Sequence, residues 1–251
     1  VDGDARGLAA VDGHLVVSTT AGKIYAFADA KQKRTVSSPS RPVSTTPFPG
    51  DESVDHYRKS AAEILERSGV TRGFCLVLGG DQGRLAYELA RQSELMIFCA
   101  EPDPTKVRAA RQALVPTGLY GNRITVDHLD LAVLPYPSYF ANLVVCDGGV
   151  PKGSVQGDPV QVARCLKPHG GVICLPWSSA LSTSDVRHAA WLSKTGLEAQ
   201  GGVVVKEGGW ITLQRVALPG AASWTHQYGN PGASSSIPDQ RVRNGLSVLW
   251  Y

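Results

Sequence analysis

Apolar and polar positions between residues 51 and 216 follow two alternating patterns. Short continuous apolar runs predict buried strands, and apolar residues three and four positions apart predict helices with one buried face. The expected helices cover 51–69, 83–92, 104–115, 158–167 and 184–195. The expected strands cover 74–79, 95–100, 123–128, 141–146 and 171–176. Strands that alternate with helices indicate an α/β fold with a parallel, doubly wound sheet.

The pattern changes at the end of this stretch. Residues 201–216, GGVVVKEGGWITLQRV, contain two apolar segments around a Glu-Gly-Gly turn, which predicts an antiparallel hairpin. We therefore expect a parallel, doubly wound sheet that ends in this hairpin. Gly69 is expected to end the first helix, and Asp103 is expected to cap the helix that starts at Pro104.

The two ends of the chain have a different character. Residues 8–28 form three short alternating segments that predict small antiparallel strands. Isolated hairpins are marginal in water, so we expect these strands to pair with residues 244–251 or with a neighbouring chain. Residues 35–50 are rich in Pro, Ser and Thr and are expected to be a linker. Residues 217–251, rich in Gly, Ser and Pro, are expected to form an extended strap ending in a strand.

Composition narrows the class of protein. With 43% hydrophobic and 19% charged residues, the chain has the balance of a globular protein, and its net charge of +3 gives no indication of nucleic-acid binding. No apolar stretch reaches 18 residues, so no membrane-spanning helix is expected. Because Val1 is not an initiator Met, the sequence reads as part of a longer chain. The cysteines lack CxxC spacing and are expected to be buried thiols rather than metal ligands: Cys75, Cys99, Cys146, Cys165 and Cys174.

Residues 74–101 carry the candidate chemistry. An apolar run ends at Gly79-Gly80-Asp81-Gln82-Gly83, a helical pattern follows, and a second apolar run ends at Glu101. Strand, glycine-rich turn, helix, strand and acid form the unit that holds an adenosine-containing ligand. Glycines allow close approach of the backbone, and the acid can accept hydrogen bonds from both ribose hydroxyls.

On these motifs, residues 51–216 resemble a class I S-adenosylmethionine-dependent methyltransferase. The glycine-rich turn of that family matches at Gly79 and Gly83, with Asp81 at its middle position and Gly80 as an additional glycine. Val77 stands where the family often has an acid. The terminal hairpin also suits the methyltransferase variant of the fold. The resemblance implies a Rossmann-like sheet of strand order 3-2-1-4-5 that ends in this antiparallel hairpin. The resemblance implies S-adenosylmethionine as cofactor and S-adenosylhomocysteine as product.

The resemblance also implies roles for residues after the second, third and fourth strands. Glu101, followed by Pro102, matches the ribose-binding acid, and Asp130 with the Leu131 N–H matches the adenine site. Asp147 stands where such folds place catalytic or acceptor-positioning groups, and His128 is a second candidate base. No Asn/Asp-Pro-Pro-Tyr signature is present, so methylation of a base or amide nitrogen is not supported, and the methyl acceptor stays open.

A second resemblance concerns the ends. The GKIYAF stretch within residues 8–28 resembles the close of a PQQ-like β-propeller blade, and LPGAASWTHQYGNPG resembles the lead-in to a further propeller segment. This implies a partial blade, a linker, a methyltransferase domain and a strap leading to further propeller at 1–34, 35–50, 51–216 and 217–251. The partners implied are the propeller segments of the parent chain and an unknown methyl acceptor.

Two alternatives remain. The domain could bind S-adenosylmethionine or S-adenosylhomocysteine without turnover, or serve as a scaffold. Asp81 in the glycine-rich turn and the absence of a catalytic signature favour this alternative. An NAD-dependent oxidoreductase is disfavoured because no G-x-G-x-x-G follows the first strand of the unit. Reduced cysteines and this cofactor point to the cytoplasm, whereas a propeller-containing parent would be exported if it carried a signal.

Overall fold

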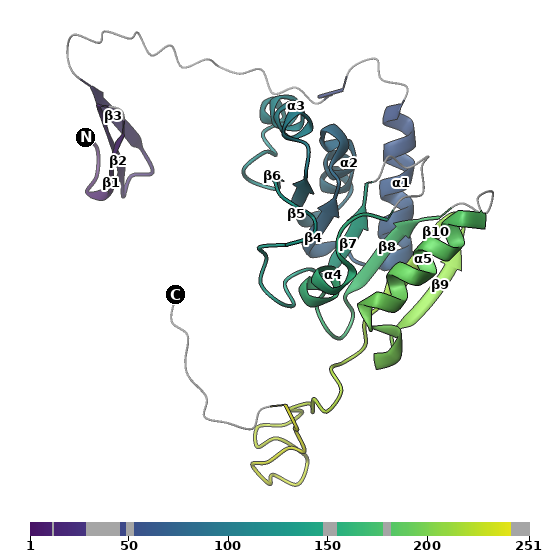
Figure 1. Ribbon diagram of the computed structural model, residues 1–251. Helices are drawn as coiled ribbons and strands as arrows, with labels where there is room; N and C mark the ends of the chain where they lie inside the picture. The colour runs from purple at the N-terminus through teal and green to yellow at the C-terminus, as the bar shows by residue number, and fades with distance from the viewer. Residues whose placement is uncertain (12, 29–45, 49–52, 148–154, 178–181, 242–251) are drawn as a thin grey trace. The chain divides into compact units, whose positions relative to one another are not determined.

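The computed structural model describes residues 1–11, 13–28, 46–48, 53–147, 155–177 and 182–241 (Figure 1). The chain divides into two compact units, Val1–Arg41 and Pro42–Tyr251. Each unit has its own sheet and is described by itself.

The first unit is a small antiparallel sheet of strand order β1-β2-β3. Its strands pair side by side as the alternating pattern predicted. Val17 and Thr19 are its buried side chains, whereas Leu8 and Ile24 are more than 70% exposed. The expected partner segment 244–251 lies outside the described residues. The strands are β1 (Ala5–Val11), β2 (His14–Thr19) and β3 (Ile24–Ala28).

The second unit contains a seven-stranded sheet of order β6-β5-β4-β7-β8-β10-β9. In the order of the chain, this is 3-2-1-4-5 followed by the terminal hairpin, so the predicted topology is confirmed. The strands are β4 (Arg72–Leu78), β5 (Glu94–Glu101), β6 (Ile124–His128), β7 (Leu143–Cys146), β8 (Val172–Pro176), β9 (Val203–Glu207) and β10 (Trp210–Gln214). The helices are α1 (Ser53–Ser68), α2 (Arg84–Gln92), α3 (Pro104–Leu114), α4 (Pro159–Cys165) and α5 (Ser182–Thr195).

Strands β4 to β8 run parallel, and β10 pairs antiparallel with both β8 and β9. The register aligns the carboxyl ends of the central strands. Leu78 at the end of β4 lies opposite Ala100 of β5 and Cys146 of β7, and Glu101 of β5 lies opposite His128 of β6. The residues that follow these ends therefore share one edge of the sheet.

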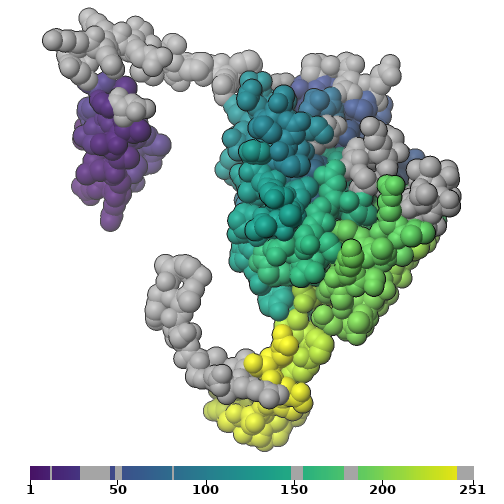
Figure 2. Space-filling model, viewed as in Figure 1, coloured from purple at the N-terminus to yellow at the C-terminus, as the bar shows by residue number. Residues whose placement is uncertain are grey.

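Helices cover both faces of this sheet (Figure 1). Helices α1, α2 and α3 share one apolar core with it, and α4 and α5 share another. The central strands carry fully buried side chains such as Leu76, Val77 and Val144. Only the outer atoms of one face are seen in the space-filling view (Figure 2). A sheet that is covered on both faces buries successive residues of each strand, which explains the continuous apolar runs in the sequence.

A loop rather than a helix joins β6 to β7. Its ring pair, Tyr136 and Phe140, stacks with centroids 5.0 Å apart, and both rings pack against Phe98 of β5. Arg164 of α4 holds the loop, because its guanidinium donates to the Leu134 and Tyr136 carbonyls at 2.7 and 2.6 Å. The aromatic side chains thus supply the apolar cover that a helix would give.

Predicted helix ends are confirmed at two positions. The Gly69 N–H donates to the Leu65 carbonyl and Gly69 has a φ of +65°, as a glycine C-cap requires. Asp103 caps α3, and its carboxylate accepts from the N–H groups of Thr105 and Lys106 at 2.7 and 3.4 Å. The bond from Thr105 is the main cause that lowers the pKa of Asp103.

Residues 219–241 contain neither helix nor strand, and they close on themselves instead of forming the extended strap we expected. The Gln240 N–H donates to the Gly220 carbonyl at 2.8 Å, and the Asp239 carboxylate accepts from the Ala222 N–H at 2.9 Å. The Asn230 side-chain amide donates to the Ser234 hydroxyl and to the Ser236 carbonyl. Asp and Asn side chains stabilise such turns by bonding to nearby backbone. The expected terminal strand lies outside the described residues.

Among the helices that the structure describes, none combines the length and apolar character needed to cross a membrane.

Candidate functional site

The predicted site residues lie at the carboxyl edge of the sheet. Gly79 follows β4, Glu101 ends β5, Asp130 follows β6 and Asp147 follows β7. Backbone hydrogen bonds join these ends: Gly79 N–H donates to Ala100, Leu129 N–H to Glu101 and Asp147 N–H to Leu78, at 2.8, 3.1 and 2.9 Å. The strand order reverses between β4 and β7: the chain adds β5 and β6 on one side of β4, then β7 and β8 on the other. Open α/β sheets bind their ligands at this switch point.

The glycine-rich turn carries the chain from β4 into α2. Gly79 has a φ of +73°, and Gly80 lies so close to β5 that a Cβ there would be 3.2 Å from the Cβ of Cys99. Residues 81–83 form a short 3₁₀ turn, in which Gln82 has a φ of 58°. The first turn of α2 has no side-chain cap, so its N–H groups face the carboxyl edge. Backbone of this kind suits close contact with a polar ligand.

Gly83 has a packing role that the sequence did not indicate. It has a φ of +78°, and an added Cβ would lie 2.8 Å from Leu114 Cδ1 and 3.4 Å from the Ala110 Cβ, both on α3. A side chain there would crowd Leu114, so the glycine allows the 3₁₀ turn to pack closely against α3.

Glu101 is 4% exposed, and its Oε1 accepts the Asp103 N–H at 2.9 Å. This bond holds the carboxylate at the end of β5. Pro102, which follows, is exposed, and its carbonyl accepts from His128 Nε2–H at 3.0 Å. That bond ties β6 to the turn after β5, so Nε2 of His128 is a donor and serves a structural role here.

Asp130 is exposed and Leu131 is 8% exposed, just beyond the end of β6. Asp130 Oδ1 accepts the Ala132 N–H at 2.9 Å, which shapes the loop. The Leu131 carbonyl accepts the Asp158 N–H at 3.0 Å. The predicted adenine site therefore lies in a loop whose backbone is fixed from two sides.

Asp147 is 2% exposed and lies among buried thiols. Burial, chiefly, and then the neighbouring Cys75 and Asp147 raise the pKa of Cys99 well above its usual range. Burial also raises the pKa of Cys146 to about 12, although its bond to the Gln156 backbone opposes the shift. All five cysteines are free and buried, as the sequence predicted.

Gln156 was not among the predicted site residues. Its carboxamide lies against the glycine turn: a Cβ on Gly79 would be 2.4 Å from Oε1 and 2.9 Å from both Cδ and Nε2. Gln156 precedes α4 and carries no motif, so the sequence offered no signal that could have found it. The contact brings together two segments that are far apart along the chain.

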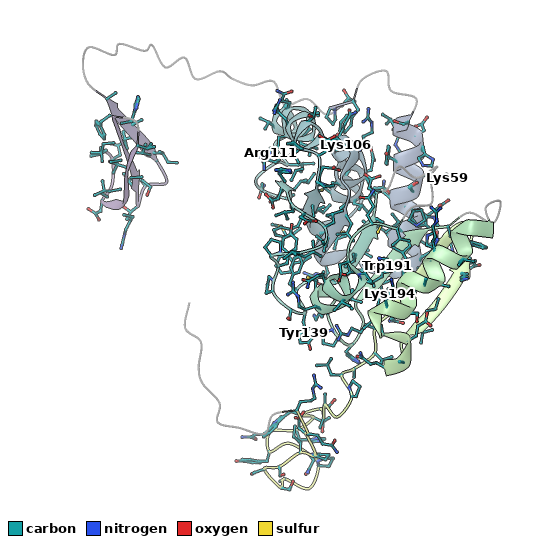
Figure 3. The ribbon with its side chains drawn as sticks, viewed as in Figure 1. Lys59, Lys106, Arg111, Tyr139, Trp191 and Lys194 are labelled. Atoms are coloured by element: carbon teal, nitrogen blue, oxygen red, sulfur yellow. The ribbon has the colours of Figure 1, made fainter. Side chains whose placement is uncertain are left out.

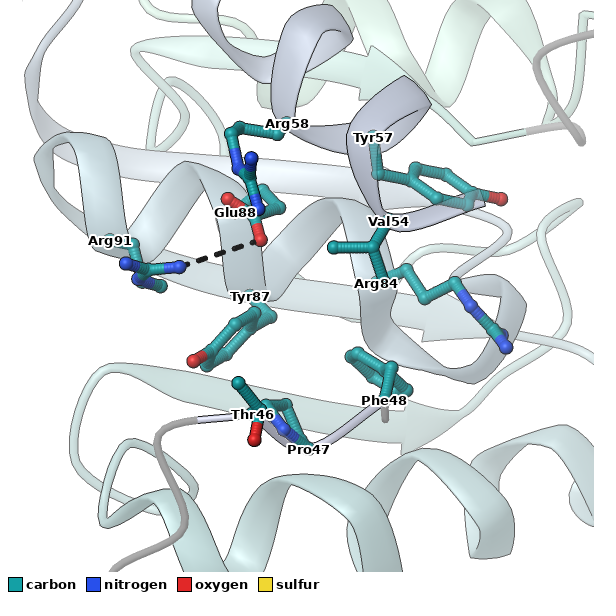
Figure 4. Close-up of a pocket in the computed structure, with 10 residues that line it drawn as sticks. All are labelled: Thr46, Pro47, Phe48, Val54, Tyr57, Arg58, Arg84, Tyr87, Glu88 and Arg91. Carbon is teal, nitrogen blue, oxygen red and sulfur yellow. Dashed lines mark ion pairs between the residues drawn. The ribbon is translucent and has the colours of Figure 1, made fainter. Parts of the chain in front are cut away.

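A separate cavity of about 50 Å³ lies between α1 and α2 (Figure 4). Arg91 and Glu88 form an ion pair at its wall, 3.8 Å apart, and Arg84 lies over the Phe48 ring, 4.9 Å from the centroid. Small-molecule sites usually have volumes of about 300–1,000 Å³. This cavity is too small for an adenosine-containing ligand, and no strand residue lines it.

Within the described part of the chain, no three His, Cys, Asp or Glu residues come together as metal ligands. The site offers instead the N-terminus of α2, glycine backbone and acids at successive strand ends. Those groups suit a ligand with ribose hydroxyls, an adenine amino group and a charged tail.

Sheet order, antiparallel β10 and the glycine turn together give the Rossmann-like fold of class I methyltransferases. A protein from Methanococcus maripaludis, described as an S-adenosyl-L-methionine-dependent methyltransferase, has the same fold: TM-score 0.54, 21% identity, covering 64% of this chain and 85% of that one. A protein from Galdieria sulphuraria, described as a sarcosine dimethylglycine methyltransferase, matches with TM-score 0.45 and 20% identity over 62% and 68% of the chains. An Aquifex aeolicus SAM-dependent methyltransferase matches with TM-score 0.47 and 14% identity over 65% and 92%.

No family model matches the sequence. No curated protein matches it either.

Proposed function

We propose that residues 51–216 bind S-adenosylmethionine and transfer its methyl group to an acceptor. One observation carries this proposal: the buried carboxylate of Glu101 lies at the end of β5, directly beside the strand that leads into the Gly79 turn. An acid in that place accepts hydrogen bonds from ribose hydroxyls. The fold shared with the M. maripaludis protein supports the same ligand.

The described residues fit the cofactor in three parts. Glu101 would hold the ribose, with Pro102 beside it, and Asp130 with the Leu131 N–H would hold the adenine. The turn at Gly79, Gly80, Asp81 and Gly83 would bring backbone N–H groups to the amino-acid tail. The cofactor supplies the activated methyl group. The task of the chain is to align it with a nucleophile and exclude water.

Asp147 is proposed to act on the acceptor rather than on the cofactor's adenosine. It follows β7, on the other side of β4 from β5 and β6, whose ends carry the proposed adenosine contacts. A carboxylate there can orient an acceptor or take its proton when the nucleophile is protonated. The acceptor is an unknown molecule, because the fold alone does not determine the substrate.

Calorimetry with S-adenosylmethionine, S-adenosylhomocysteine and NAD, each titrated into the full chain, tests the proposal. Binding of the first two with no heat from NAD is the expected result. Binding of NAD alone would contradict the proposal and indicate a nicotinamide-dependent oxidoreductase. Mass spectrometry of any ligand retained through purification gives an independent check.

A domain that binds the cofactor without turnover is the second candidate, favoured by the burial of Asp147 at 2% exposure. A carboxylate so enclosed reaches an acceptor only if the edge opens. The two candidates differ in one measurement. A cell extract with methyl-labelled S-adenosylmethionine is compared with and without the added chain, since the extract's own methyltransferases label in both cases. An additional labelled acceptor is expected if the domain is an enzyme, and identical labelling if it only binds.

We further propose that the first unit is a partial PQQ-like propeller blade of a longer parent chain. Its three antiparallel strands leave apolar side chains about half exposed or more on both faces, Leu8 and Phe27 on one and Val11 and Ile24 on the other. Neighbouring blades of a propeller would cover both faces. Hydrogen exchange would test this. Slow exchange of β1–β3 in the full-length parent and fast exchange in the 251-residue chain are expected, and equal exchange in both would contradict the proposal.

A further inference from the structure

Residues 156–158, the crossing segment, lie at the point between β4 and β7 where the strand order reverses. Gln156 lies on Gly79, which follows β4, and its carbonyl accepts a weak bond from the Cys146 thiol of β7 at 3.9 Å. A Cβ on Gly157 would lie 3.3 Å from Leu78 Cδ1. The segment therefore touches the ends of both β4 and β7, the two strands between which such folds bind their ligands.

Hydrogen bonds fix this segment at two further points. The Trp191 indole N–H donates to the Gly157 carbonyl at 2.9 Å, and Trp191 faces the sheet from α5 (Figure 3). The Asp158 N–H donates to the Leu131 carbonyl, and the Asp158 carboxylate caps α4 by accepting from Gln161 N–H at 2.9 Å. The backbone on the carboxyl side of Gln156 is thus fixed to α5 and to the loop after β6, which keeps Gln156 at the edge of the sheet.

The proposed adenosine contacts occupy the other half of the edge. Glu101 ends β5 and Asp130 follows β6, and both strands lie on the side of β4 away from β7. A ligand with its adenosine over β5 and β6 extends its remaining atoms toward Gly79 and β7. For S-adenosylmethionine, those atoms are the amino-acid end, which carries an ammonium and a carboxylate.

We propose that Gln156 binds the amino-acid end of the cofactor and selects for ligands that possess one. This inference rests on the proposed function. A carboxamide suits the role because Nε2 donates to a carboxylate while Oε1 accepts from an ammonium. Its position on Gly79 places both groups where the turn lets a ligand approach the backbone closely.

The test compares two thioethers that differ at this end. S-adenosylhomocysteine carries the amino acid, whereas 5′-methylthioadenosine carries a methyl group in its place, and neither has a sulfonium charge. Both are titrated by calorimetry into the 251-residue chain and into its variants Gln156→Ala and Gln156→Leu. The leucine variant retains most of the volume and removes the hydrogen bonds.

Both variants are expected to lose about 10-fold or more in affinity for S-adenosylhomocysteine, the size of a hydrogen bond to a charged group. Their affinity for 5′-methylthioadenosine should stay within about twofold. The control Gln161→Ala removes a carboxamide that bonds to Arg164 within α4 and should leave both affinities unchanged. Melting temperatures of all variants show whether the segment keeps its place.

Four results would overturn the inference. Equal losses for both ligands would show that Gln156 supports the structure of the site. An unchanged affinity for S-adenosylhomocysteine would show that the carboxamide does not touch the ligand, and a tighter affinity would show that it occupies the ligand's place. If the unmodified chain binds neither thioether, the proposed function fails, and the role of Gln156 fails with it.

Discussion

Glu101 and Asp103 are joined by a 2.9 Å hydrogen bond from the Asp103 N–H to Glu101 Oε1. The end of β5 is thereby tied to the cap of α3, because Asp103 in turn accepts from the first N–H groups of that helix. The carboxylate proposed to bind ribose is thus positioned by the same turn that starts the next helix.

Replacing Glu101 with Ala should therefore weaken binding of S-adenosylmethionine. Loss of two charge-assisted hydrogen bonds, about 2–4 kcal/mol, corresponds to a rise of about 30- to 1,000-fold in Kd, measured by calorimetry. Glu94→Ala is the control, since Glu94 starts the same strand and its side chain is 79% exposed beside Arg72. An unchanged Kd in Glu101→Ala would refute the assignment of the site.

Asp147 should affect turnover and not cofactor affinity. The variant Asp147→Ala is expected to bind S-adenosylmethionine within about threefold of the unmodified chain, because the residue follows β7 rather than the strands proposed to hold the adenosine. Methyl transfer to the true acceptor should fall. If Asp147→Ala lost the cofactor as severely as Glu101→Ala, the methyl group would lie elsewhere.

Gly83 should be sensitive to a single added methyl group. In Gly83→Ala the left-handed backbone costs about 1–2 kcal/mol, and the contact with Leu114 adds about 1–3 kcal/mol of overpacking. Gly69→Ala is the matched control, since Gly69 also has a positive φ but nothing within 4 Å of an added Cβ. Urea unfolding should show a clearly larger loss at position 83. Equal losses would remove the packing role.

Stability should depend on pH through the buried thiols. Burial raises the pKa of Cys146 from 9.0 to about 12, so the thiol stays neutral in the folded chain at a pH where the unfolded chain ionises it. The stabilisation is complete below pH 9 and is lost as pH rises toward 12, by about 1.4 kcal/mol per pH unit.

The variant Cys146→Ala isolates this effect. Above pH 9 its free energy of unfolding should decline less steeply than that of the unmodified chain, by about 1.4 kcal/mol per pH unit, while between pH 6 and 8 the two should run parallel. Urea titrations at each pH provide the measurement. Parallel curves at all pH values would mean that Cys146 ionises equally in both states.

Local sequence patterns determined most of the architecture. Apolar runs and helical spacing were sufficient for the strands and helices from Ser53 to Gln214, because each element buries a face that its own residues define. Turn and cap residues such as Gly69 and Asp103 placed element ends, since their chemistry acts on neighbouring backbone. Strand order was implied by the resemblance to class I methyltransferases, which also pointed to Glu101 and Asp130 at strand ends.

Only the tertiary structure decided which groups meet across the chain. The role of Gly83 against Leu114 depends on the distance between two helices, and the position of Gln156 on Gly79 depends on how one segment crosses the edge of the sheet. The loop at 219–241 likewise closes through the pairing of Gly220 with Gln240. Contacts of this kind arise from packing between remote segments, which leaves no periodicity or spacing in the sequence to reveal it.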